Sequence, residues 1–135
     1  MINLLSDRHQ VLQFIDQCFG YIDIAKTTWL KNVPPQDEVG YKVQLIANSV
    51  ISETQSLFRT KYARTTRAMI KFELSVAQAI ALLQVLQHLP MRLDDVYMNA
   101  ARANWIAQLD QALIAMEILR PRERPAGVPG APNYD

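Results

Sequence analysis

Hydrophobic residues spaced three and four positions apart run along most of the chain, which is the period of an amphipathic helix. The first such stretch predicts a helix from about Asp7 to Leu30, which Ser6 or Asp7 could cap. Its apolar face comprises Val11, Ile15, Cys18, Ile22, Ala25 and Trp29.

A second helix is predicted to begin just after Pro34 and Pro35, because the acidic residues Asp37 and Glu38 suit the first turn of a helix. Its apolar face comprises Val39, Val43, Ile46, Val50 and Leu57. One position of that face, between Val50 and Leu57, is polar.

The chain from Tyr41 to Leu89 contains neither glycine nor proline, so two interpretations compete. One continuous helix would be about 70 Å long at roughly 1.5 Å per residue, too long for the other segments to cover. A turn near Thr60 to Thr66 is favoured, with Thr65 or Thr66 capping a third helix. Its apolar residues are Met69, Ile70, Phe72, Leu74, Val76, Ala79, Ile80, Leu82, Leu83 and Leu86. A helix this apolar is buried on most sides, and three neighbours would not cover it, which suggests a subunit interface.

Pro90 ends the third helix, and Asp94 or Asp95 opens a fourth that is expected to end at Pro121. The apolar residues of this fourth helix include Trp105, Ile106, Leu109, Ala112, Leu113, Ile114, Met116 and Leu119. Four helices joined by short connections predict an all-α fold, an antiparallel up-down-up-down four-helix bundle. The bundle would occupy residues 1–120, and residues 121–135 would form a Pro-rich tail, extended or disordered when alone.

Composition narrows the class of protein. The chain of 135 residues has a formal net charge of only +1 and 50% hydrophobic residues, which fits one globular domain and confines any nucleic-acid contact to a local surface. Cys18 is the single cysteine, so no internal disulfide framework is possible. No apolar run is long enough for a membrane span, and Met1 to Gln10 lack the order of a signal peptide. We therefore expect a cytoplasmic protein.

Residues with catalytic or metal-binding chemistry are sparse. The sequence contains no phosphate-binding glycine loop, no nucleophile elbow and no Glu-x-x-His pair. His9 and His88 lack metal-ligand spacing, and Cys18 lies on an apolar helix face, where a thiol is usually inert. Glu53 and Glu73 could be paired as acid and base, but bonding to nearby cations or solvent is the simpler interpretation. We predict no catalytic residue, metal or cofactor.

The strongest functional signal is the stretch LFRTKYARTTRAMIKF, from Leu57 to Phe72. It contains five cations and only one aromatic residue with a polar tip, Tyr62, while no acidic residue occurs from Thr54 to Phe72. The cations are Arg59, Lys61, Arg64, Arg67 and Lys71. Such a cluster at a hairpin bend could contact phosphates, with Arg64, Arg67 and Lys71 along one helical stripe. Alternatively, it could be a solvated turn. Tyr62 could stack on a base or cover the end of the bundle, whereas Trp29, Phe72 and Trp105 are predicted in the core.

The order of these signals resembles a known family. A Pro-led helix start at VPPQDEVGYKVQLIANSVISE, the basic turn RTKYARTTR and the helix KFELSVAQAIALLQVLQHL are similar to four-helix-bundle proteins that include the ribosomal-RNA intervening-sequence proteins and the accessory proteins of diversity-generating retroelements. The resemblance covers roughly Trp29 to Arg120. The chain departs from that pattern in its near-neutral charge, and NWIAQLDQALIAMEILR lacks the Gly-rich, Trp-ending signature of the fourth helix in the retroelement branch.

This resemblance implies a non-enzymatic homopentamer with a central channel, which in the retroelement branch binds a reverse transcriptase and its template RNA through basic surface. On this chain, the matching residues would be Arg59, Lys61, Arg64, Arg67 and Lys71. The first hypothesis is therefore an oligomeric scaffold that binds RNA or a nucleic-acid enzyme. The second is a protein–protein adaptor, in which the Pro-rich tail or an outer helix face recruits a partner.

Overall fold

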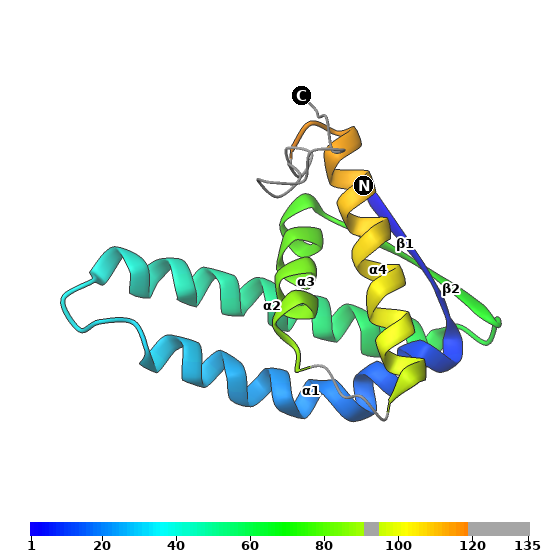
Figure 1. The fold of residues 1–135 in the computed structure, drawn as a ribbon, viewed down its shortest axis with the longest axis horizontal. Helices are drawn as coiled ribbons and strands as arrows, with labels where there is room; N and C mark the ends of the chain where they lie inside the picture. The colour runs from blue at the N-terminus through cyan, green and yellow to red at the C-terminus, as the bar shows by residue number, and fades with distance from the viewer. Residues whose placement is uncertain (91–94, 119–135) are drawn as a thin grey trace, which may run out of the picture.

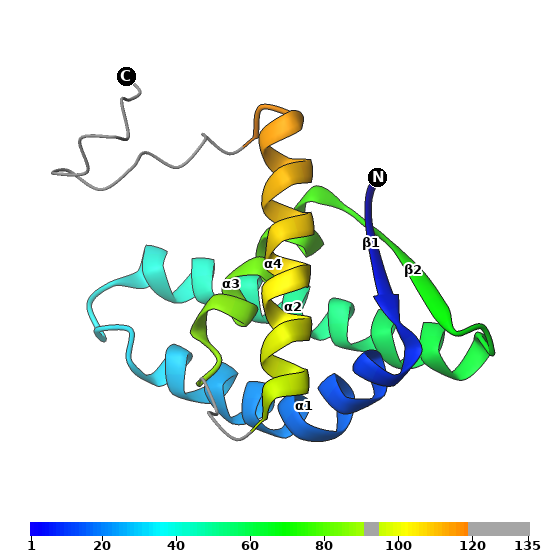
Figure 2. The same ribbon diagram turned by 45° about the vertical axis from the view of Figure 1, so that its right-hand side comes forward.

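The computed structural model describes residues 1–90 and 95–118, which form four helices and two strands. The order is β1 (Ile2–Asp7), α1 (Arg8–Lys31), α2 (Glu38–Arg64), β2 (Met69–Leu74), α3 (Val76–His88) and α4 (Val96–Ala115). Helices α1 and α2 form a long antiparallel hairpin, and α3 and α4 stand across one half of it beside the strands (Figures 1 and 2). No helix in the described part of the chain is long and apolar enough to span a membrane.

The two strands show that the predicted all-α four-helix bundle is wrong. β1 and β2 pair antiparallel, with Ile2 opposite Leu74 and Asp7 opposite Met69. Side chains alternate between the core and the surface along both strands, as a half-buried sheet requires. The buried row is Ile2, Leu4, Ser6, Ile70, Phe72 and Leu74. Residues assigned to the start of a third helix are therefore a strand, and their apolar spacing follows a period of two.

The third helix consequently starts later than predicted. α3 begins at Val76, and its cap is Ser75 rather than Thr65 or Thr66. The Ser75 hydroxyl accepts a hydrogen bond from the Gln78 N–H at 3.1 Å, and the Gln78 side chain accepts one from the Ser75 N–H at 3.0 Å. This reciprocal capping box fixes the strand-to-helix junction.

Several helix ends agree with the sequence prediction. The carboxylates of Asp7, Asp37 and Asp95 cap α1, α2 and α4, each accepting a hydrogen bond from a backbone N–H of the first turn. α3 ends at His88, just before Pro90. α4 is shorter than predicted, because it ends at Ala115 rather than at Pro121. The predicted Pro-rich tail lies outside the described residues.

The core is organised around four aromatic side chains contributed by α1, α2, β2 and α4. The rings of Phe58 and Phe72 stack at 4.1 Å between centroids, and Trp105 meets Phe14 edge to face at 5.0 Å. The indole N–H of Trp105 donates to the Ser6 hydroxyl at 3.0 Å, so this buried polar group is satisfied. Aromatic burial from four separate elements therefore holds the sheet on the helices.

Helix α3 is covered within the chain. Its buried residues are Ala79, Ala81, Leu82, Leu83, Val85 and Leu86, and α2, α4 and β2 surround it. The strand β2 supplies extra cover that helices alone would not give. The apolar character of this helix is thus explained without a subunit interface.

The far half of the α1–α2 hairpin projects beyond α3 and α4 (Figure 1). No residue from Lys26 to Val50 is fully buried. We call this segment, residues 26–50, the arm, and the rest of the described chain the body. On the arm, Val39, Val43 and Ile46 are 74%, 58% and 65% exposed.

Candidate nucleic-acid interface

The five predicted cations lie on three different elements. Arg59, Lys61 and Arg64 belong to the last two turns of α2, Arg67 lies in the connection to β2, and Lys71 lies on the exposed face of β2. The predicted helical stripe of Arg64, Arg67 and Lys71 is therefore wrong. The predicted bend itself is present, because α2 ends at Arg64 and the chain reverses into β2.

A sixth cation, Arg8, joins this end of the molecule. Its backbone N–H donates to the Ala68 carbonyl at 2.8 Å, which ties the start of α1 to the connection before β2. Its guanidinium carbon lies 4.0 Å from the centroid of the Tyr62 ring, a cation–π contact. One of its terminal nitrogens, Nη1, is buried and has no hydrogen-bond partner among the described residues. Sequence reasoning missed Arg8 because only strand pairing brings it here.

We call the group Arg8, Lys61, Arg64 and Arg67 the basic corner. Arg64 and Arg67 are exposed, whereas Arg8 and Lys61 are half-buried. No ion pair joins any of these four side chains to a carboxylate within residues 1–90 and 95–118. The charges of the basic corner are therefore not neutralised by the described part of the chain, which leaves them able to attract a polyanion.

The other two predicted cations have local partners. The Arg59 guanidinium carbon lies 4.8 Å from the Phe19 ring centroid, so part of this side chain covers the body. Lys71 Nζ lies 4.0 Å from a Glu73 carboxylate oxygen, with both side chains 58% exposed. Exposed pairs of this kind are weak, yet Glu73 offsets the charge of Lys71. Arg59 and Lys71 therefore belong at the rim of the interface.

Tyr62 is half-buried and packs against the core while Arg8 occupies one face of its ring. This geometry favours a role in covering the end of the body over stacking on a base. The ring also holds the Arg8 guanidinium in place, since a cation over an aromatic face is attracted by the ring quadrupole.

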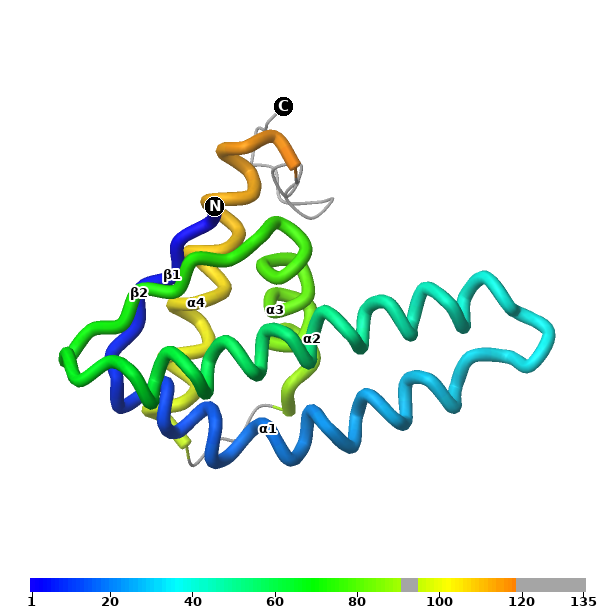
Figure 3. The backbone as a smooth tube through the Cα atoms, turned by 180° about the vertical axis from the view of Figure 1, so that it is seen from behind, coloured from blue at the N-terminus to red at the C-terminus, as the bar shows by residue number. Residues whose placement is uncertain are grey.

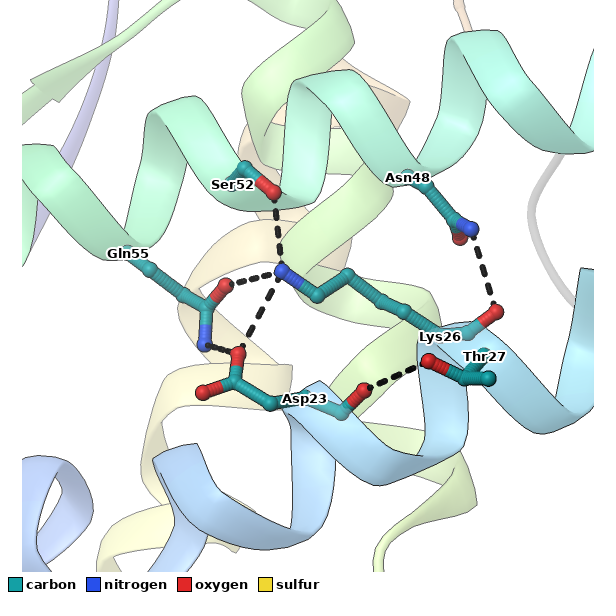
Figure 4. Close-up of polar contacts among 6 residues, drawn as sticks. All are labelled: Asp23, Lys26, Thr27, Asn48, Ser52 and Gln55. Atoms are coloured by element: carbon teal, nitrogen blue, oxygen red, sulfur yellow. Dashed lines mark hydrogen bonds and ion pairs between the residues drawn. The ribbon is translucent and has the colours of Figure 1, made fainter.

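Lys26 illustrates the opposite arrangement, a cation used inside the fold (Figure 4). Its Nζ donates to Ser52 Oγ and Gln55 Oε1, both at 2.8 Å, and lies 3.3 Å from Asp23 Oδ1. Gln55 in turn donates to Asp23 Oδ1 at 3.0 Å, and this hydrogen bond, helped by Lys26, lowers the pKa of Asp23 below its ordinary value. This network joins α1 to α2 where the arm leaves the body.

The remaining candidates fit structural roles. His88 Nδ1 lies 2.8 Å from the Gln84 carbonyl and its ring packs edge-on against Trp29, while the His9 ring lies 5.8 Å from that of Tyr97. Glu53 is exposed and Cys18 is half-buried. Within the described ranges, no group of three or more His, Cys, Asp or Glu side chains could hold a metal ion.

Comparisons with family models, curated proteins and solved structures found no match to this chain. The resemblance to the intervening-sequence and retroelement accessory proteins thus rests on sequence pattern alone, and β1 and β2 are elements that the implied all-α bundle lacks.

Proposed function

We propose that the chain is a non-enzymatic, cytoplasmic accessory protein that binds single-stranded RNA electrostatically through the basic corner. The observation that carries this proposal is the convergence of Arg8, Lys61, Arg64 and Arg67 from two helices and a connection, with no carboxylate paired to them among the described residues. Phosphate contacts of this kind give affinity without base specificity. An oligomeric scaffold and a reverse-transcriptase partner stay proposals that depend on the sequence resemblance.

The test is a salt titration of binding to a short single-stranded RNA by fluorescence anisotropy. With about four phosphate contacts, one for each cation of the basic corner, the logarithm of the binding constant should fall with the logarithm of salt concentration with a slope of about −2.8. The variant Arg64→Glu/Arg67→Glu should bind at least about tenfold more weakly at low salt, because two exposed attractions become repulsions.

The matched control is Lys31→Glu/Lys42→Glu, which changes the net charge by the same amount at exposed positions in the arm. It should lose much less affinity than the basic-corner variant. Equal loss in both variants would mean that net charge alone governs binding. Unchanged weak binding in wild type and both variants would rule out the nucleic-acid role.

A second candidate, a protein–protein adaptor, is favoured by the apolar stripe on the arm. Val39, Val43 and Ile46 follow the four–three spacing of a coiled-coil seam and yet face solvent. If Val43→Lys abolished association with a purified partner while Arg64→Glu/Arg67→Glu left it unchanged, the adaptor function would replace RNA binding.

A further inference from the structure

The outer edge of β1 is closed by a side chain of α4. The Gln108 amide donates to the Leu5 carbonyl at 2.8 Å and accepts from the Leu5 N–H at 2.9 Å. The glutamine therefore makes the two hydrogen bonds that a neighbouring strand would make. An edge covered in this way cannot pair with another chain at Leu5.

The outer edge of β2 carries no such cover. Because both backbone polar groups of Leu5 point to Gln108, Leu5 and Lys71 form a non-hydrogen-bonded pair of the ladder, and the flanking pairs carry the bonds. The Arg8 N–H bond to the Ala68 carbonyl continues the same alternation. It follows that the N–H and C=O groups of Met69, Lys71 and Glu73 point away from β1.

No hydrogen bond from the described residues reaches these outward groups of β2. Figure 3 shows β2 on the side of the sheet away from α4. The Lys71 and Glu73 side chains, two residues apart on the exposed face of the sheet, are each 58% exposed. A row of unpaired backbone groups of this kind is a template for strand addition.

The charges on this edge are self-complementary. If β2 pairs antiparallel with β2 of a second copy about a two-fold axis at Phe72, Lys71 of each copy lies opposite Glu73 of the other, and their outward backbone groups form hydrogen-bonded pairs. The buried row, which includes Ile70 and Leu74, stays on the core side in both copies. An axis at Lys71 or at Glu73 would instead place like charges opposite each other.

We propose that the chain forms a two-fold dimer by antiparallel pairing of the β2 edges, which joins two two-stranded sheets into one of four strands. A lysine alone discourages edge pairing. Glu73, two residues further along β2, supplies the opposite charge that Lys71 of a second copy can meet, and it does so in one register. This dimer requires no nucleic acid and does not rest on the proposed RNA binding.

Charge reversal tests the dimer by sedimentation equilibrium over a range of protein concentrations. Lys71→Glu and Glu73→Lys should each weaken dimerisation about tenfold, because each change creates two like-charge pairs across the axis. The double variant Lys71→Glu/Glu73→Lys should restore the dimer to within about twofold, since the pairs are again opposite in sign. Matched controls are Lys42→Glu and Glu53→Lys, at exposed positions of α2, which should leave dimerisation unchanged.

Amide hydrogen exchange gives a second measurement on the unaltered protein. The amides of Lys71 and Glu73 should become protected as concentration rises, whereas that of Asn3, which points outward on β1 by the same alternation, should not. A wild type that stays monomeric up to roughly millimolar concentration would overturn the proposal. So would a dimer that ignores the β2 charge variants and dissociates in Val43→Lys, which would place the contact on the arm.

Discussion

The arm and the body use the same helices in different ways. In the body, α1 contributes Phe14 and α2 contributes Phe58 to an aromatic core that also contains side chains of β2 and α4. In the arm, the same two helices pack mainly against each other, with Trp29 also contacting His88 of α3, and no residue between Lys26 and Val50 is fully buried. The polar network around Lys26 marks the boundary between the two regions (Figure 4).

This difference shows that an apolar stripe does not identify the buried face of a helix. Val39, Val43 and Ile46 have the spacing of a helical seam but are exposed. The side of α2 that meets α1 and the body instead uses Ile51, Thr54, Gln55 and Phe58 as its buried residues, two of them polar. The arm is therefore held by few apolar contacts, and local opening should begin there.

The largest expected effect is the loss of a core aromatic side chain. Trp105→Ala should lower the free energy of unfolding by about 3–5 kcal/mol, because the indole is fully buried and the cavity cannot collapse completely. Val43→Ala on the arm should change it by no more than about 0.5 kcal/mol. Urea denaturation of both variants measures this contrast, and similar losses in the two would contradict the division into body and arm.

An intermediate effect is expected at the covered edge of β1. Gln108→Ala should lower the free energy of unfolding by about 1–3 kcal/mol, because it removes both hydrogen bonds to Leu5. The Leu5 N–H and C=O groups must then bind water instead. The Leu5 amide should exchange faster, while the Phe72 amide, within the β1–β2 ladder, should change less. Gln111→Ala, at an exposed position of the same helix, is the control and should have little effect on either amide.

The smallest effect concerns pH and the boundary of the arm. Since the folded-state pKa of Asp23 is lowered, chiefly by the Gln55 hydrogen bond, its contribution is present above the unfolded-state pKa of about 3.9. That contribution is lost as the pH falls through the lower folded-state value. Wild type should therefore be more stable than Asp23→Asn at pH 6, and the difference should shrink towards pH 3. A difference independent of pH would show that the carboxylate charge is not involved.

Helix boundaries set by local chemistry could be predicted from the sequence. Asp7, Asp95 and Pro90 act within one turn of the residues they affect. The sheet could not be predicted in the same way, because β2 is six residues long and its apolar positions fit both helical and strand spacing. Its identity depends on β1, which lies far away along the chain.

The candidate site shows the same division. The run of cations from Arg59 to Lys71 is visible in the sequence, and so is the bend within it. The presence of Arg8 beside Tyr62 and the Lys71–Glu73 pair depend on tertiary structure. A fixed cluster therefore replaces the helical stripe that spacing alone suggested.

The pairing of β1 with β2 also sets an order of events during synthesis. β1 leaves the ribosome before α1 and α2, which can form their hairpin through contacts close in sequence. β1 stays unpaired until β2 has been synthesised. Trp105, whose indole donates to Ser6, is synthesised later still, as part of α4. A nascent chain would thus hold β1 unpaired until β2 has emerged, the interval in which chaperone contact would matter most.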